Sequence, residues 1–245
     1  MAKPWIGIPT RFQDEHTTGK IRTYLEAILW AGGLPVMIPT FTSPANLLEY
    51  ANRLDGVLLP GSSSDIDPAC YGEPAHPRLG KLVPDRDALD FALLEYAEKA
   101  NLPVLGICFG AQSLNVFRGG TLIQDIPALV TEPVCHDDDG DPQQPARHLV
   151  RLSKGSLLER LAGKDLVEVN SFHHQSAGQV GKNLQAVATA PDGVIEAVEE
   201  TSSGRFVVGV QWHPERGFQK DAFAQILFTT FVEEAAKSKT HSRSV

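Results

Sequence analysis

The chain has 245 residues, of which 42% are hydrophobic and 21% charged, and its formal net charge is -8. Length and composition predict a single globular domain over residues 1–245, and the acidic balance argues against a nucleic-acid surface, which needs clustered Lys and Arg. No apolar run reaches the ~18–20 residues of a membrane-spanning helix. Three cysteines are too few for a disulfide framework, so we expect a cytoplasmic protein that contacts no membrane.

The first half of the chain alternates apolar runs with amphipathic stretches. Strands are expected at residues 5–9, 35–38, 56–59 and 103–107. Helices are expected at residues 21–30, 44–53, 84–100 and 109–118. Strand followed by helix in this order predicts a parallel sheet with right-handed crossovers.

The second half has short apolar runs with short connections, which predict antiparallel pairs at one edge of the sheet. These strands are expected at residues 148–152, 167–169, 184–188, 194–198 and 206–211. A helix over residues 221–236 closes the chain, and a tail from about 237 to 245 is expected to be disordered. Residues 136–144 carry four aspartates without the spacing of a calcium loop, so we interpret them as a solvated loop.

The strongest local signal is Gly106-Ile107-Cys108-Phe109-Gly110, between a predicted strand and a predicted helix. It is the nucleophile-elbow pattern with Cys in place of Ser, in which glycines relieve crowding at a strained turn. A helix N-terminus stabilises a thiolate at Cys108, and the Phe109 N–H is the first candidate to hold an oxyanion. The alternative is a buried structural cysteine. Cys70 and Cys135 have no elbow around them, and we interpret them as structural.

His213 and Glu215 follow the last predicted strand, separated by Pro214. Residues two apart on an extended chain point to the same side, and proline keeps this segment extended at a strand end. The spacing is that of a base oriented by an acid. The alternative is a chance surface pair. We expect no metal at this His, because no third ligand stands at suitable spacing.

These two motifs together resemble the class I glutamine amidotransferase-like superfamily. Two further segments resemble its gamma-glutamyl-gamma-aminobutyrate hydrolase (peptidase C26-like) branch, namely Leu59 to Pro68 with Tyr71-Gly72-Glu73, and Asn170 to Gln175. The resemblance extends from about Ile6 to the last helix. It implies a flavodoxin-like three-layer α/β/α sandwich with a mostly parallel central sheet and a small antiparallel extension.

The resemblance also implies a gamma-glutamyl substrate, with Cys108 as nucleophile, His213 as general acid/base and Glu215 as its orienter. It places a second oxyanion N–H at Gly61 or Ser62. It assigns substrate contacts to Gln112, His173, His174 and Arg86, although the two histidines could instead be loop residues that face water. For Asp87 we favour a simple acidic first turn of a helix.

The sequence departs from the branch at two places. Ser62, Ser63 and Ser64 stand where glycines are usual, which makes a positive φ costly in that turn. Phe109 stands where Arg is common, which removes a charged contact but leaves the backbone N–H unchanged.

We therefore expect a hydrolase that needs no metal or organic cofactor and that takes a small gamma-glutamyl compound, such as gamma-glutamyl-gamma-aminobutyrate, to glutamate and an amine. Two alternatives stay open. One is a glutaminase subunit that delivers ammonia to a separate synthetase. The other is a non-catalytic protein that binds gamma-glutamyl ligands. The identity of the leaving amine and the oligomeric state, with a homodimer as one candidate, are not determined by the sequence.

Overall fold

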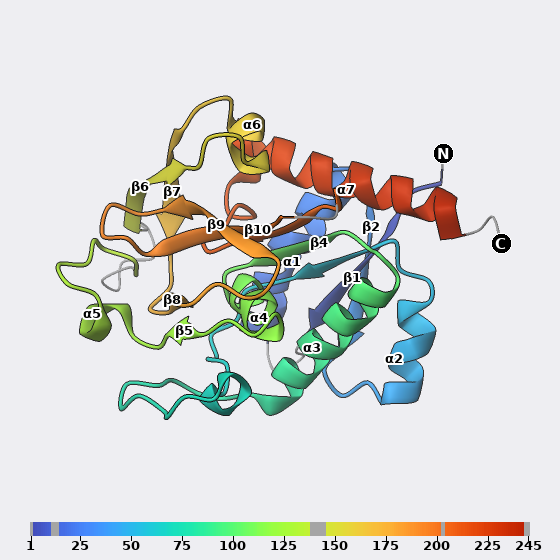
Figure 1. The fold of residues 1–245 in the computed structure, drawn as a ribbon. Helices are drawn as coiled ribbons and strands as arrows, with labels where there is room; N and C mark the ends of the chain where they lie inside the picture. The colour runs from blue at the N-terminus through green and yellow to red at the C-terminus, as the bar shows by residue number, and fades with distance from the viewer. Residues whose placement is uncertain (1, 11–14, 138–145, 202–203, 243–245) are drawn as a thin grey trace.

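The computed structural model describes residues 2–10, 15–137, 146–201 and 204–242, and these form one 11-stranded sheet with helices on both faces (Figure 1). The paired strands follow the order β2-β1-β3-β4-β11-β10-β9-β6-β7, and β5 and β8 pair off this path. The strands are β1 (Trp5–Thr10), β2 (Leu34–Pro39), β3 (Gly56–Leu59), β4 (Val104–Ile107), β5 (Leu122–Ile123), β6 (Ala146–Leu152), β7 (Leu166–Ser171), β8 (Ser176–Ala177), β9 (Leu184–Thr189), β10 (Ile195–Glu200) and β11 (Val207–Val210).

The parallel part of the sheet consists of β2, β1, β3, β4 and β11. Every residue of β3, β4 and β11 is buried, as is typical of parallel strands that are covered on both faces. Parallel strands end at the same edge, so the residues after β3, β4 and β11 meet at one rim of the sheet. The predicted parallel core is confirmed.

The antiparallel part of the sheet begins at β10, which pairs with β11, and continues through β9, β6 and β7. Residues of β6 alternate between buried and exposed along most of the strand, because one face packs on the core and the other faces solvent. The antiparallel extension consists of strands that the sequence predicted, and its position at one edge of the sheet is as expected.

Helices form the two outer layers. They are α1 (Glu15–Trp30), α2 (Pro44–Ala51), α3 (Pro84–Lys99), α4 (Phe109–Phe117), α5 (Ile126–Leu129), α6 (Leu157–Ala162) and α7 (Ala222–Ser242). On one face α1 packs beside α7, with Ile28 and Phe228 in the shared core. On the other face α3 packs beside α4, with Leu93 and Leu114 in a second core. The predicted α/β/α sandwich is confirmed.

Three details differ from the sequence-based expectations. The strands β5 and β8 and the helices α5 and α6 were not predicted, because they span only two to six residues and carry weak periodicity. The last helix continues to Ser242, so the tail is helical beyond residue 237, and residues 243–245 lie outside the described residues. Within the expected solvated loop, His136 is buried, and residues 138–145 lie outside the described residues.

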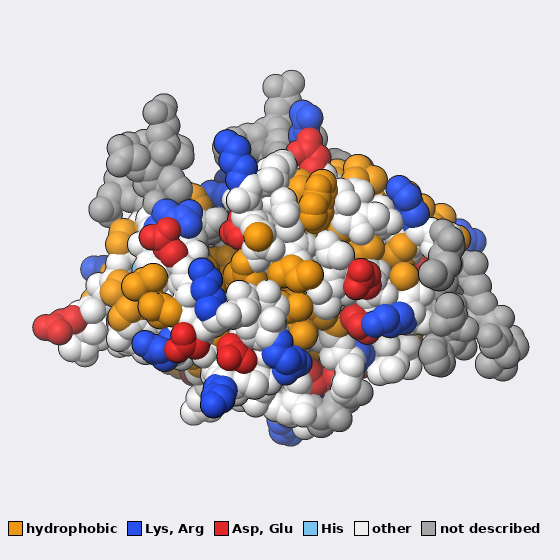
Figure 2. All heavy atoms as spheres, turned by 90° about the horizontal axis from the view of Figure 1, so that it is seen from above, with side chains coloured by type: hydrophobic (Ala, Val, Ile, Leu, Met, Phe, Trp, Pro, Cys, Tyr) orange, Lys and Arg blue, Asp and Glu red, His pale blue; other side chains and the backbone are white. Residues whose placement is uncertain are grey.

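Charged side chains of both signs are scattered over the face seen from above in Figure 1, with hydrophobic side chains between them (Figure 2). None of the described helices combines the length and the apolar character that a membrane crossing requires.

Candidate active site

Cys108 stands at the tight turn between β4 and α4, as the N-cap residue of that helix. Its backbone has φ 52 and ψ -110, a conformation that non-glycine residues rarely adopt. The Cys108 N–H donates to the carbonyl of Val210 on the neighbouring strand at 2.8 Å, which ties the turn to the end of β11. A strained backbone held by surrounding bonds is a frequent feature of functional sites.

The glycines on either side of Cys108 permit this turn. A Cβ atom at Gly106 would lie 2.6 Å from the carbonyl oxygen of Gly110, and one at Gly110 would overlap the carbonyl of Leu59 on β3. Neither position tolerates a side chain, because the contacts are with backbone atoms. The steric reason for the predicted elbow is confirmed.

His213 and Glu215 lie just beyond the end of β11, and both are buried. The His213 Nδ1 is 2.7 Å from the Glu215 Oε1, so the carboxylate occupies this ring nitrogen. Burial alone would lower the pKa of His213, but Glu215 and Cys108 together raise it to about 10. The imidazole is thus paired with the acid, as the spacing predicted, and Cys108 is close enough to contribute to the raised pKa of the ring.

Tyr24 of α1, within the helix expected at residues 21–30, also joins this group. Its hydroxyl accepts the Gly61 N–H at 3.1 Å and lies 3.4 Å from the His213 Nδ1. A Cβ atom at Gly61 would be 2.9 Å from both the His213 Cε1 and the Tyr24 hydroxyl. Position 61 therefore requires glycine, because His213 and Tyr24 approach its backbone too closely for a side chain. The sequence carried no signal for Tyr24, because only the fold brings α1 to this edge of the sheet.

The candidate oxyanion donors flank Cys108. The Phe109 N–H is at the first position of α4, where a helix offers no internal acceptor. Across the turn, the Ser64 N–H donates to the Ser62 Oγ at 3.1 Å. Among the described non-glycine residues, positive φ angles occur at Asn101, Cys108, Glu132 and Asn183, so the three serines after Gly61 carry no such strain.

Arg86 is buried beside this turn. Its Nε is 2.7 Å from the Asp90 Oδ1, and its Nη2 donates to the carbonyl of Pro60 at 2.6 Å. Its guanidinium also lies over the Phe109 ring, 4.8 Å from the centroid. The side chain predicted to contact substrate thus supports the two segments that carry the candidate oxyanion donors.

The other residues that were predicted to contact substrate lie in different parts of the structure. The Gln112 Nε2 donates to the carbonyl of Gln175 at 3.1 Å and to the Gln211 Oε1 at 3.2 Å. The His174 Nε2 is 2.9 Å from the Asp65 Oδ1, and this hydrogen bond and the nearby Asp125 raise the pKa of His174. His173 points away from the turn into a separate buried cluster with His136.

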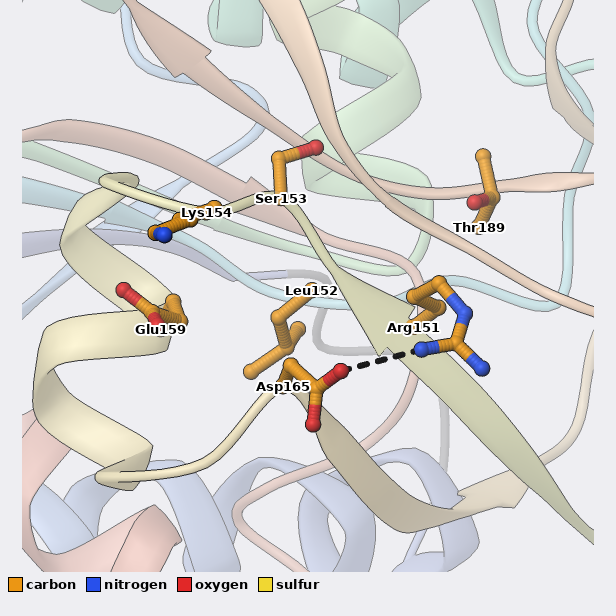
Figure 3. A pocket seen from close by; sticks show the side chains of 7 residues that line it. All are labelled: Arg151, Leu152, Ser153, Lys154, Glu159, Asp165 and Thr189. Atoms are coloured by element: carbon orange, nitrogen blue, oxygen red, sulfur yellow. Dashed lines mark hydrogen bonds and ion pairs between the residues drawn. The ribbon is translucent and has the colours of Figure 1, made fainter.

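A surface hollow of about 530 Å³ lies on the antiparallel part of the sheet (Figure 3). An ion pair of 3.0 Å between Arg151 and Asp165 crosses it, and both side chains are exposed. None of the residues predicted for the active site lines this hollow. Its polar, solvated lining therefore has no connection with the Cys108 turn.

Comparison with known proteins shows the family of the chain. The family model of peptidase C26 matches residues 4–215, a range that contains the elbow, Tyr24 and the His213–Glu215 pair. The chain belongs to the peptidase C26 family. Membership of this family supports a hydrolase activity.

Similarity to individual proteins and to a solved structure extends over nearly the whole chain. Protein NtpR of Enterococcus hirae is 36% identical over 223 residues, covering 91% of this chain and 92% of the relative. Gamma-glutamyl-gamma-aminobutyrate hydrolase PuuD of Escherichia coli (strain K12) is 35% identical over 243 residues, covering 95% of this chain and 93% of the relative. A crystal structure described as a GMP synthase subunit from Thermoplasma acidophilum has a TM-score of 0.67 at 14% identity, covering 98% of both chains, and shows the fold alone.

Proposed function

We propose that the protein hydrolyses the gamma-glutamyl amide bond of a small compound to glutamate and a free amine. Cys108 is the nucleophile, His213 the general acid/base and Glu215 the residue that orients His213. The observation that carries this proposal is a strained cysteine at a helix N-terminus beside a buried imidazole bonded to a carboxylate at 2.7 Å. The resemblance to a relative named as a gamma-glutamyl-gamma-aminobutyrate hydrolase supports the substrate class.

In the first step His213 holds the proton of Cys108, and the sulfur attacks the gamma-carbonyl carbon. A C–S bond forms as the carbonyl electrons move onto oxygen, and the Phe109 N–H stabilises this oxyanion. We assign the second donor to the Ser62 N–H rather than to Gly61, because the Gly61 N–H donates to the Tyr24 hydroxyl.

In the second step His213 gives its proton to the leaving nitrogen, the C–N bond breaks and a gamma-glutamyl thioester remains. The raised pKa of His213 supports this step, since the imidazolium is available as the acid at neutral pH. Water then loses a proton to His213 and attacks the thioester. The C–S bond breaks, glutamate leaves and Cys108 recovers its proton.

For the substrate we propose that Gln112 and His174 contact the glutamyl end, and that Arg86 acts as a positioning residue through Pro60 and Phe109. His174 faces two carboxylates, Asp65 and Asp125, which favour its protonated form. The chemical steps use only side chains and backbone amides of this chain, and the proposed partner is the small-molecule substrate alone.

The test is to incubate the purified protein with gamma-glutamyl-gamma-aminobutyrate, gamma-glutamyl polyamines and glutamine, and to follow glutamate by mass spectrometry. We expect release from an amide, loss of release in Cys108→Ala, and full release in Cys70→Ala, which removes an exposed free thiol. Release from glutamine alone would favour the alternative of a glutaminase that serves a separate synthetase. Binding of these compounds without turnover would favour the non-catalytic alternative and contradict the proposal.

A further inference from the structure

A second group of chemically reactive side chains lies outside the proposed active site. His136, His148, His173 and Glu196 converge in the interior, and all four are buried. We refer to these four residues as the histidine cluster. They come from four separate segments: the loop before residue 138, β6, the loop that follows β7, and β10.

The inward-facing atoms of the histidine cluster lack hydrogen-bond partners within the described structure. These orphaned atoms are the His136 Nδ1, the His148 Nε2, the His173 Nε2 and both carboxylate oxygens of Glu196. Buried polar groups are almost always hydrogen-bonded, and here three ring nitrogens face the Glu196 Oε1 at 3.3–3.5 Å, which is long for a hydrogen bond. Such an arrangement indicates that something else satisfies them.

The distances fit the coordination shell of a metal ion. The Glu196 Oε1 lies 3.3 Å from the His136 Nδ1, 3.3 Å from the His148 Nε2 and 3.5 Å from the His173 Nε2. Ligands at about 2.0–2.1 Å in a tetrahedral zinc site are about 3.3–3.4 Å apart. The four ligand atoms all lie within 4.8 Å of one another, so a small inward movement of the rings would bring each of them to a central ion.

The outward-facing nitrogens of the three imidazoles are already held. The His136 Nε2 is 2.9 Å from the Asp192 Oδ2, and Asp192 is itself held by the N–H groups of Val134 and Val194. The His173 Nδ1 is 3.0 Å from the carbonyl of Gln175, and the His148 Nδ1 is 3.4 Å from the carbonyl of Leu149. Carboxylate and carbonyl acceptors behind metal-binding histidines fix the tautomer that leaves the inner nitrogen free for the metal.

We propose that His136, His148, His173 and Glu196 bind a structural Zn²⁺ ion. Three imidazoles and one carboxylate are ligands that zinc prefers, and four protein ligands close a tetrahedral shell with no position for substrate. The site is distinct from Cys108, His213 and Glu215. Its chemistry is binding alone and involves no reaction step.

The ion would join the segments that lead to the active site. The His173 N–H donates to the carbonyl of His136 at 2.9 Å, and the Ser171 hydroxyl donates to the same carbonyl at 2.7 Å. His173 also lies between Asn170, which bonds the His213 backbone, and His174. Zinc at the histidine cluster would therefore stabilise the part of the chain that positions His213.

The test measures metal binding directly. The full-length Cys108→Ala chain, in which the nucleophile cannot act as a ligand, is stripped with a chelator, dialysed against Zn²⁺ and analysed by plasma mass spectrometry. We expect about one Zn²⁺ per chain, and a rise in Tm of about 5–10 °C if zinc exceeds its Kd ~100-fold. Substitution with Co²⁺ should give the visible absorption of a tetrahedral nitrogen–oxygen site without thiolate charge transfer.

Matched variants locate the site. His148→Gln and Glu196→Gln should lose the bound metal, Asp192→Asn should weaken metal affinity about 10–100-fold, and His76→Gln, outside the histidine cluster, should bind as the parent does. Absence of stoichiometric binding in the parent chain would overturn the proposal. So would a Co²⁺ spectrum with thiolate bands, or undiminished binding in a folded His148→Gln variant. If the variants do not fold, the parent chain's Co²⁺ spectrum and metal content still decide.

Discussion

The side chain of Asn170 holds both backbone groups of His213. The Asn170 Nδ2 donates to the His213 carbonyl at 2.8 Å, and the His213 N–H donates to the Asn170 Oδ1 at 2.8 Å. Asn170 lies on β7 and His213 follows β11, strands that are not neighbours in the sheet. Two bonds from one amide therefore fix the position of the proposed general acid/base across the sheet edge.

We expect Asn170→Ala to lower kcat about 10–100-fold, because His213 loses its backbone support and moves from its position beside Cys108. Loss of the two bonds should also lower the free energy of unfolding by about 1–3 kcal/mol. Steady-state kinetics and urea unfolding measure the two effects. Asn170→Asp keeps the acceptor and loses the donor. Its kcat and its free energy of unfolding should therefore lie between those of the parent chain and those of Asn170→Ala. Unchanged kcat in Asn170→Ala would contradict the positioning role.

Glu215→Gln should lower kcat by about 10²–10⁴-fold, because an amide neither fixes the His213 tautomer nor stabilises the imidazolium. The pKa of His213 is raised to about 10 partly by Glu215, so removing this charge lowers the pKa. The imidazolium then loses its proton at lower pH, and the alkaline limb of the rate profile should move to lower pH. If the alkaline limb of Glu215→Gln lay at the same pH as that of the parent chain, Glu215 would not control the pKa of His213.

Gly61→Ala should abolish most activity while the chain remains folded. Its Cβ would stand 2.9 Å from the His213 Cε1 and 2.9 Å from the Tyr24 hydroxyl, so the imidazole must move. Gly119→Ala is the matched control, since it introduces a methyl group at φ +81 with no heavy atom within 4 Å. The control should lose about 1 kcal/mol of stability and keep its kcat. Equal kcat values for the two variants would refute the steric explanation.

Asp87 gives a test of stability that is independent of catalysis. Burial raises the pKa of Asp87 to about 6, although the Asp67 N–H opposes the shift. The folded state therefore binds this proton more tightly than the unfolded chain. The resulting stabilisation is present below about pH 4 and is lost as pH rises through about 6.

Asp87→Asn should accordingly raise the free energy of unfolding by about 1–3 kcal/mol at pH 8, with a smaller gain at pH 5. The amide keeps an oxygen that can accept the Asp67 N–H and removes the buried charge. Urea unfolding at the two pH values measures the difference. An equal gain in the free energy of unfolding at the two pH values would show that ionisation of Asp87 does not destabilise the folded protein.

Local sequence predicted the parallel core and the ends of its strands. The elbow around Cys108 and the His213–Glu215 pair were readable because each motif lies within five residues and follows a strand, so its geometry depends on short-range sterics. The Gly106 and Gly110 contacts confirm that reasoning, and Phe109 stands at the helix position expected of an oxyanion donor.

Periodicity could not predict which strands become neighbours. The order of β9, β6 and β7 decides that Asn170 reaches His213, and the packing of α1 decides that Tyr24 reaches Gly61. For the same reason the sequence could not show that the buried donors of Arg86 bind Pro60 and Asp90.

The sequence by itself predicted the elbow around Cys108 and the pairing of His213 with Glu215, because each of these two motifs is short and local. The histidine cluster was decided by the tertiary structure alone. Its four side chains are separated by 12 or more residues and lack the short spacing of familiar metal motifs, so the sequence predicted no metal. The pairing of β6 with β9 and of β9 with β10 brings His148 near Glu196, and the bond from the His173 N–H to the His136 carbonyl brings the other two rings to the same place in the interior.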